Sequence, residues 1–233
     1  MIIQAFHLTK VHSSGVKVLD DAYFYAGSGS FVVVIGESKT GKSTFLRMLG
    51  GEEKPTSGTL RVDHLDLYTL PPGEKQEWLS DVGMVFPDLK LFADKTVEEN
   101  ILFALRVKGA GTGIDEKKEA ITRLLTNAGL GPKAKALSGD LSSGELRMVL
   151  SLRAMIFRPR LLLADDPFQG LDEKAVAVLF HLLSELHKTG ATIVLSTQQL
   201  AFIEEARRSE LGATIRWVRL QDGKLLPLEG AAP

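Results

Sequence analysis

The segment IGESKTGKST, residues 35–44, has the residue types and spacing of a loop that holds phosphate. Glycines in such a loop let backbone N–H groups turn inward around phosphate oxygens, and the N-terminus of a following helix favours the negative charge. The lysine then reaches the β- and γ-phosphates, and the next hydroxyl binds Mg²⁺. The sequence predicts a site for ATP and Mg²⁺ formed by Gly36, Glu37, Ser38, Lys39, Thr40, Gly41, Lys42, Ser43 and Thr44. The plainer alternative is a glycine turn with an exposed lysine.

Two adjacent carboxylates end a second apolar segment, RLLLADD, residues 160–166. Ligands of an open parallel sheet bind at the carboxyl ends of its strands. We therefore expect Asp165 to bind Mg²⁺, usually through water, and Asp166 to orient or deprotonate an attacking water. The alternative is a pair of surface acids at a strand terminus.

The elements that must position these residues follow from the apolar pattern. The runs FVVVIG, VGMVF, RLLLAD and ATIVLST favour strands that are buried on both faces. The segments STFLRMLGG and DEKAVAVLFHLLSELHKTG have helical spacing and end at glycines. Hairpins are expected with turns at Ser57-Gly58 and at Asp222-Gly223.

Residues 88–158 favour helices. One begins after Thr96 with acidic residues in its first turn, and a second is expected to be capped at Asp115. A third, SSGELRMVLSLRAMIF, is apolar on most sides and is therefore expected to be buried. The segment GAGTG, residues 109–113, is interpreted as a linker.

The predicted fold class is α/β: a P-loop NTPase core with a mostly parallel sheet flanked by helices, antiparallel N-terminal strands and an inserted helical subdomain. Residues 1–233 form a single domain in this prediction. Its nucleotide-binding core comprises residues 1–87 and 159–233, and its helical subdomain comprises residues 88–158.

Composition narrows the class of protein further. The chain has 233 residues, of which 44% are apolar and 24% charged, and a net charge of -1, without the basic excess that nucleic-acid binding needs. It has no cysteine, which excludes disulfides and thiolate metal sites, and its histidines show no ligand spacing. The apolar runs are shorter than the roughly 18 residues of a spanning helix. The N-terminus lacks a secretory pattern, so we expect a cytoplasmic protein, unless a partner holds it at a membrane.

The order of the motifs resembles the ATP-binding domain of ABC transporters. The phosphate loop is followed by LSSGE at 141–145, LLLADDP at 161–167 and GLD at 170–172, and the resemblance covers nearly the whole chain. The segments GEEKPTSG, VGMVFPDLKLFADKTVEENILFAL and RPRLLLADDP are most similar to the FtsE group of cell-division ATPases, with the LolD and MacB exporter ATPases as near relatives. The resemblance implies an ATPase that forms a homodimer when ATP is bound. It also implies a separate integral membrane permease, FtsX-like, at the inner face of the cell membrane, and no nucleic acid.

In such a dimer, the signature segment of one subunit caps the γ-phosphate that the other subunit holds. The resemblance assigns this role to Ser142, Ser143, Gly144 and Glu145, at the N-terminus of a helix, where anions bind favourably. Taken alone, LSSGE is also the pattern of a plain helix cap. His12 stands where the family usually has an aromatic residue stacked on adenine, and the alternative is an ordinary loop histidine.

Four positions depart from the family's pattern. Lys39 replaces a loop glycine and either crowds the loop or places a second cation near phosphate. Pro87 replaces a glutamine that reaches Mg²⁺ and the attacking water, and proline has no side-chain donor or acceptor and no N–H. Asp166 replaces the catalytic glutamate and is one methylene shorter. The shorter side chain matters because a base must come within about 2.6–3.2 Å of its proton. Gln198 replaces the switch histidine and cannot carry a positive charge.

The candidate catalytic residues are therefore Asp166 and Gln198, in a site whose binding residues are retained. Two functions remain open at this point. The first is an FtsE-like ATPase that drives or regulates a separate permease and hydrolyses ATP slowly. The second is a catalytically impaired, nucleotide-gated scaffold that binds ATP and dimerises without useful turnover. Nucleic-acid-associated relatives carry long coiled-coil or zinc insertions or a second cassette, which this chain does not have.

Overall fold

A six-stranded sheet forms the centre of the computed structural model, which describes residues 1–109 and 113–228. Its strand order is β10-β9-β3-β8-β7-β6, and every neighbouring pair is parallel except β10 with β9. The strands are β3 (Phe31–Ile35), β6 (Val82–Val85), β7 (Leu161–Asp165), β8 (Thr192–Ser196), β9 (Arg216–Gln221) and β10 (Lys224–Pro227). The predicted fold class, with its mostly parallel sheet, is confirmed.

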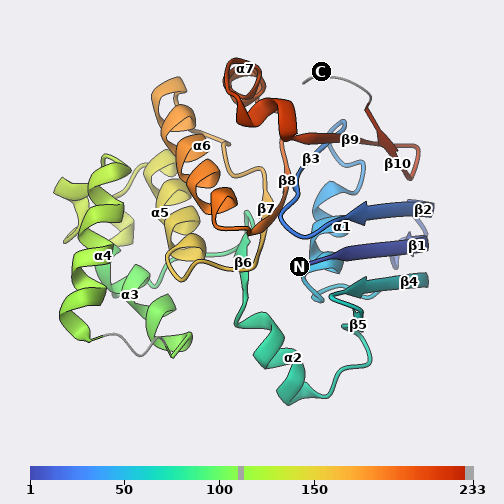
Figure 1. Cartoon of the computed structure of the whole chain (residues 1–233), viewed down its shortest axis with the longest axis horizontal. Helices are drawn as coiled ribbons and strands as arrows, with labels where there is room; N and C mark the ends of the chain where they lie inside the picture. The colour runs from blue at the N-terminus through green and yellow to red at the C-terminus, as the bar shows by residue number, and fades with distance from the viewer. Residues whose placement is uncertain (110–112, 229–233) are drawn as a thin grey trace.

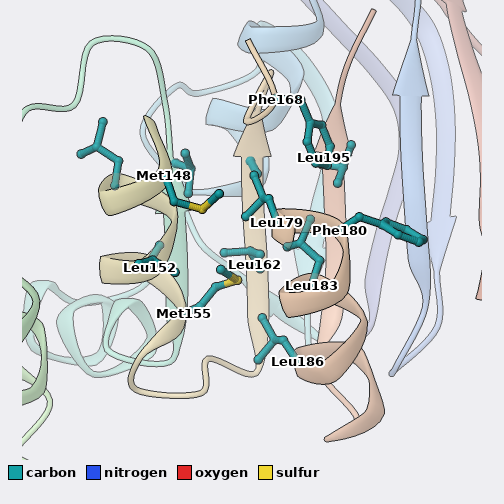
Figure 2. Packing of buried hydrophobic residues seen from close by; sticks show 14 of the residues in the cluster. Met148, Leu152, Met155, Leu162, Phe168, Leu179, Phe180, Leu183, Leu186 and Leu195 are labelled. Atoms are coloured by element: carbon teal, nitrogen blue, oxygen red, sulfur yellow. The ribbon is translucent and has the colours of Figure 1, made fainter. Parts of the chain in front are cut away.

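The inner strands are buried on both faces, as their continuous apolar runs predict. Val32 and Val34 of β3 belong to one buried cluster, whereas Phe31 and Val33 belong to a second cluster on the opposite face. Figure 2 shows the second cluster, where side chains of α5 and α6 pack against Leu162 of β7. Alternating side chains therefore fix the sheet between two layers and leave its carboxyl edge free for polar residues.

A smaller antiparallel sheet of four strands lies beside the central one, in the order β2-β1-β4-β5. Its strands are β1 (Ile3–Val11), β2 (Lys17–Ala26), β4 (Ser57–Val62) and β5 (Leu65–Asp66). Ile3, Ala5 and Leu8 of β1 face the cluster that also contains α1. The expectation of antiparallel N-terminal strands is confirmed.

The helices are α1 (Lys42–Leu49), α2 (Pro72–Leu79), α3 (Val97–Val107), α4 (Ile114–Asn127), α5 (Ser143–Met155), α6 (Glu173–Lys188) and α7 (Leu200–Arg208). Short 3₁₀ turns span Gly131–Lys133, Ser138–Asp140 and Leu211–Thr214. Figure 1 places α3 and α4 at one end of the molecule and β1, β2 and β4 at the other. Among the described residues, no helix combines the length and apolarity needed to cross a bilayer.

The segment between β6 and β7 carries α3, α4 and α5. Thr96 caps α3 in a capping box with Glu99, as the acidic first turn predicts. Buried residues of all three helices belong to the same cluster as the central sheet, so the division of the chain at 88 and 158 stays a prediction.

Three local expectations differ from the structure. The hairpin between β4 and β5 turns at Asp63-His64, both at positive φ, rather than at Ser57-Gly58, which lies within β4. Gly58 is there for another reason, because a Cβ at this position would lie 2.2 Å from the His7 carbonyl oxygen of β1. Its glycine therefore marks a close approach of two strands and not a turn.

The remaining differences concern helices. α4 begins at Ile114 with Gly113 as its N-cap, so Asp115 lies in the first turn instead of capping the helix. α2 was not expected, since its polar sequence carries weak apolar periodicity. α7 was not expected either, although Phe202, Ile203 and Ala206 recur at helical spacing and are buried. Of the proposed linker GAGTG, residues 110–112 lie outside the described residues.

The close approach at Gly58 gives a stability prediction. Gly58→Ala adds a Cβ against the His7 carbonyl at a φ of +91, so we expect the free energy of unfolding to fall by more than about 1 kcal/mol in urea titrations. Gly73→Ala is the matched control, because nothing lies within 4 Å of its added Cβ and alanine favours the helix by up to about 1 kcal/mol. Equal stabilities of the two variants would contradict this account.

Candidate nucleotide site

The phosphate loop joins the end of β3 to the start of α1, and two of its positions require glycine. A Cβ on Gly36 would lie 2.5 Å from the carbonyl oxygen of Leu220, and one on Gly41 would lie 2.8 Å from Cβ of Val18. Gly41 is the N-cap of α1 at φ 104, a left-handed conformation. The loop is therefore pressed between β9 and the β1–β2 hairpin, with the N-terminus of α1 opening onto it.

Lys42 turns its ammonium back onto the loop. Its Nζ donates hydrogen bonds to the carbonyl oxygens of Gly36, at 2.7 Å, and Glu37, at 2.6 Å. Burial lowers the pKa of the Lys42 ammonium, and the carboxylates of Asp165 and Asp166 oppose that change. A bound triphosphate would offer charged oxygens in place of the two carbonyls. The Lys42 ammonium is therefore placed to donate hydrogen bonds to phosphate.

Gln198 reaches the same carbonyl from the segment after β8. Its Nε2 donates a hydrogen bond to the Gly36 oxygen at 2.6 Å. The structure therefore brings the predicted switch residue directly onto the phosphate loop.

A cavity of about 700 Å³ opens beside these groups. We call it the phosphate-loop cavity; its lining residues are Ile35, Gly36, Glu37, Ser38, Thr40, Gln198, Arg219, Leu220, Gln221 and Asp222. Lys39 is not among the lining residues; its side chain is exposed and its backbone has φ 65. The loop thus adopts the conformation that a glycine would favour, with a lysine in its place.

Asp165 and Asp166 lie at the carboxyl edge of the sheet, next to the end of β8. Asp165 is 4% exposed, pairs in register with Ser196 and accepts a 2.6 Å hydrogen bond from the Ser196 hydroxyl. Asp166 has φ 48, and its backbone N–H donates to the Ser196 carbonyl at 3.0 Å. The Thr197 hydroxyl donates to the Asp166 carboxylate at 3.3 Å. These bonds hold both carboxylates beside Lys42.

The environment of Asp166 suits a proton acceptor. Burial raises the pKa of its carboxyl group, and the charge of Asp165 acts in the same direction. The hydrogen bond from Thr197 and the charges of Arg147 and Lys42 act in the opposite direction. A carboxylate with a raised pKa is a stronger base than an exposed one.

Ser43 and Asp165 are the residues that fit a magnesium ion. Mg²⁺ prefers oxygen ligands and keeps most of its coordination for water and phosphate, so one or two protein oxygens suffice. Ser43 lies exposed in the first turn of α1, and the Asp165 carboxylate has one oxygen without a bond among the described residues. A hydroxyl and a carboxylate at one sheet edge are such a donor set.

His12 follows β1, and its imidazole lies at the start of α1. Its Nε2 is 3.3 Å from the hydroxyl of Thr44, which is itself buried. The half-buried ring therefore stands beside the phosphate loop, where a base attached to the phosphates could reach it.

The signature segment forms a second cavity of about 340 Å³. Ser142 caps α5 in a capping box, because it accepts from the Glu145 N–H at 3.2 Å and donates its own N–H to the Glu145 carboxylate at 2.8 Å. Gly144 lies so close to the carbonyl of Gly170 that a Cβ would come within 2.8 Å of it. This signature cavity shares no lining residue with the phosphate-loop cavity. The two cavities are therefore separate within one chain.

The family model described as "ABC transporter" matches residues 19–169. The chain belongs to the ABC transporter family as an ATP-binding cassette. Cell division ATP-binding protein FtsE of Mycobacterium tuberculosis is 35% identical over 227 residues, covering 97% of this chain and 95% of that protein. Methionine import ATP-binding protein MetN 2 of Shouchella clausii is 35% identical over 229 residues, covering 97% of this chain and 64% of that protein.

A solved cassette shares the fold in full. The dimeric structure of a post-hydrolysis state of the ATP-binding cassette MJ0796, bound to ADP and Pi, has a TM-score of 0.84 and 29% identity. The match covers 96% of each chain. The resemblance to ABC cassettes and the ATPase class are thereby confirmed.

Pro87 lies exposed after β6 in this cassette, on a segment that α1 holds in place. Arg47 of α1 lies 4.9 Å from the ring centroid of Phe86 and donates to the Asp88 carboxylate at 2.6 Å. The segment is thus anchored on both sides of Pro87, but Pro87 itself has neither a polar side chain nor a backbone N–H to offer the site.

Sequence reasoning missed two hydrogen-bond partners of the carboxylates and one nearby cation, Arg147, whose charge acts on Asp166. Ser196 and Thr197 bond Asp165 and Asp166, and Arg147 of α5 donates a 3.5 Å hydrogen bond to Gln169 in the turn after β7. The signal for the first two was available, since two hydroxyl residues end the apolar run of β8 at the same sheet edge as the carboxylates. Arg147 carried no such signal, because its direction depends on the rotation of α5.

The left-handed conformation of Lys39 gives a second prediction. A residue with a Cβ pays roughly 1–2 kcal/mol there, and glycine does not. We expect Lys39→Gly to unfold with a free energy about 1 kcal/mol higher than Lys39→Ala, both measured in urea. Because both variants lack the lysine charge, the difference between their stabilities reports the backbone conformation alone. Equal stabilities would show that the loop relaxes out of this conformation.

Proposed function

We propose that this cassette binds ATP with Mg²⁺ at the phosphate loop and hydrolyses it slowly to drive or regulate a separate membrane permease. The observation that carries the proposal is the convergence of Lys42 and Gln198 on the Gly36 carbonyl. Both donors stand where the terminal phosphates would lie, beside the carboxylates of the neighbouring strand.

Binding follows from the groups already in place. Lys42 exchanges two carbonyl oxygens for phosphate oxygens, and the N-terminus of α1 adds its N–H groups. Ser43 and Asp165 hold Mg²⁺, which when bound neutralises charge on the phosphates. His12 lies beside the α1 N-terminus and offers its ring face to the base.

Hydrolysis follows the same geometry but with weaker groups. Asp166 takes the proton of the attacking water, and its carboxylate is held by Thr197 at 3.3 Å. Its side chain is one methylene shorter than a glutamate, and a displacement of about 1 Å can cost on the order of a hundredfold in rate. Pro87 contributes no polar side chain to position that water, and Gln198 brings no positive charge.

A second subunit completes the site in this proposal. The signature cavity around Ser142 and Gly144 lies apart from the phosphate loop of its own chain, so it would serve the nucleotide of a partner subunit. The dimeric form of the solved cassette MJ0796 supports this arrangement. We assign Ser142, Ser143, Gly144 and Glu145 to contacts with that nucleotide.

An apolar groove supports the permease partner. Its volume is about 380 Å³, and exposed aromatic rings of Phe92 and Phe103 pack edge to face at 4.8 Å along it. Val107 is 67% exposed beside them, and Lys90 lines the same groove. Exposed apolar residues rimmed by charge are typical of a protein interface. The groove would receive a cytoplasmic segment of an FtsX-like permease and hold the cassette at the inner face of the membrane.

A nucleotide-gated scaffold without useful turnover is the second candidate function. The observation in its favour is that Pro87, Asp166 and Gln198 all depart from the hydrolytic pattern, while Lys42 and Ser43 are retained. In that case ATP would close a dimer that braces a membrane complex.

Turnover separates the two functions. We expect purified protein to release phosphate from Mg-ATP faster than Lys42→Ala does, and we expect Asp166→Glu to raise the rate by roughly tenfold or more, because the longer acid reaches the water. Continuous phosphate-release assays measure both. Wild-type release no faster than that of Lys42→Ala, together with retained ATP binding, would favour the scaffold. No gain in Asp166→Glu would place the defect at Pro87 or Gln198.

The groove is tested by co-purification with a candidate FtsX-like permease. Phe103→Asp places a charge among apolar residues, so we expect its recovery with detergent-solubilised permease to fall roughly tenfold or more. Leu226→Asp is the matched control, because Leu226 is similarly exposed, at 46% against 41%, and lies outside the groove. An unchanged recovery of Phe103→Asp would remove the groove from the interface.

A further inference from the structure

The phosphate-loop cavity has one wall that the established motifs do not account for. This wall is β9, whose backbone runs parallel to β3 with Ile35 paired to Arg219. The next residue, Leu220, places its carbonyl oxygen so close to Gly36 that a Cβ there would be 2.5 Å away. β9 is therefore in direct contact with the first residue of the phosphate loop.

Arg219 extends from this wall into the lining of the cavity. It is exposed, and its guanidinium makes no hydrogen bond or ion pair with any residue in 1–109 or 113–228. Other arginines near the sheet edges are engaged, such as Arg216, which donates to the Tyr25 carbonyl at 2.8 Å. Because the Arg219 guanidinium has no partner among the described residues, its N–H donors remain available to a ligand.

Glu37 and Asp222 are the acidic lining residues, and Arg219 is the cationic one. Lys42 is directed at the carbonyls of Gly36 and Glu37, and Gln198 is neutral and bonded to Gly36. A phosphate that displaced Lys42 from these carbonyls would therefore lie beside a cavity in which Arg219 is the cationic donor and the Ser38 hydroxyl a neutral one.

We propose that Arg219 is a specificity-determining residue that binds the terminal phosphate of ATP and so distinguishes ATP from ADP. The inference rests on the proposed binding of ATP at the phosphate loop. Arg219 supplies, from the opposite side of β3, the positive charge that Gln198 cannot carry. ADP lacks the γ-phosphate, and its β-phosphate is held by Lys42 and the backbone N–H groups, so Arg219 contributes little to ADP binding.

Competition binding tests this assignment without relying on turnover. A fluorescent N-methylanthraniloyl-ADP probe is displaced by ATP or by ADP in the presence of Mg²⁺, which gives two dissociation constants for each variant. We expect Arg219→Gln to weaken ATP binding by roughly tenfold, the scale of one charge-assisted contact, and to change ADP binding less than about twofold. Arg219→Lys should retain part of the preference, because it keeps the charge but not the planar fork.

Arg61→Gln is the matched control. Arg61 is an exposed strand arginine like Arg219, but it lies on the antiparallel sheet and outside the cavity. Equal losses for ATP and ADP in Arg219→Gln, or no loss for either, would overturn the proposal while leaving wild-type ATP binding intact. Failure of the wild-type protein to bind either nucleotide would instead overturn the proposed function. Thermal unfolding followed by circular dichroism confirms that the variants are folded.

Discussion

The carbonyl oxygen of Gly36 is the point on which the site depends. It accepts hydrogen bonds from Lys42 at 2.7 Å and from Gln198 at 2.6 Å, while the Leu220 carbonyl of β9 lies so close to the Gly36 Cα that a Cβ there would be 2.5 Å away. No side chain fits at position 36, so the end of β3, the segment after β8 and β9 are all held against one peptide. Because the donors to this oxygen are also the donors that a phosphate needs, the protein keeps its binding groups ordered through a contact that the ligand replaces.

The central sheet makes that convergence possible. Parallel strands end at a common edge. The register of β7 with β8 is therefore enough to bring the carboxylates at the end of β7 next to the hydroxyls at the end of β8. Asp165 pairs with Ser196 in the ladder, and its carboxylate accepts from the same serine. The layers on each face of the sheet are apolar, and they fix the register because a shift by one residue would move every buried side chain to the other face.

In the proposed function, the site combines groups that bind ATP with groups that hydrolyse it slowly. Lys42, Ser43 and Asp165 are of the types that hold a triphosphate and its metal, whereas Asp166 is short for a base and position 87 is apolar. Arg219 offers a charge from a strand that the family's motifs do not include. Under the proposed slow hydrolysis, such a cassette would spend much of its cycle with nucleotide bound.

Sequence reasoning located the elements whose signal is local. The Val-rich run of β3, the capping boxes at Thr96 and Ser142 and the hairpin at Asp222-Gly223 all have short-range causes, and each is present. The turn at Asp63-His64 was misplaced because Gly58 serves a contact with another strand. Arg147 and Arg219 were missed for the same kind of reason, since their neighbours are set by strand order and helix rotation.

Isothermal titration calorimetry with Mg-ATP tests the central claim most directly, because it reports occupation of the phosphate loop without requiring hydrolysis or a membrane partner. The account predicts saturable heat with one nucleotide per chain and micromolar-range affinity, and weaker binding by at least roughly tenfold when Lys42 is replaced by alanine. Absence of heat at millimolar Mg-ATP with folded protein, or equal binding by the alanine variant, would contradict it.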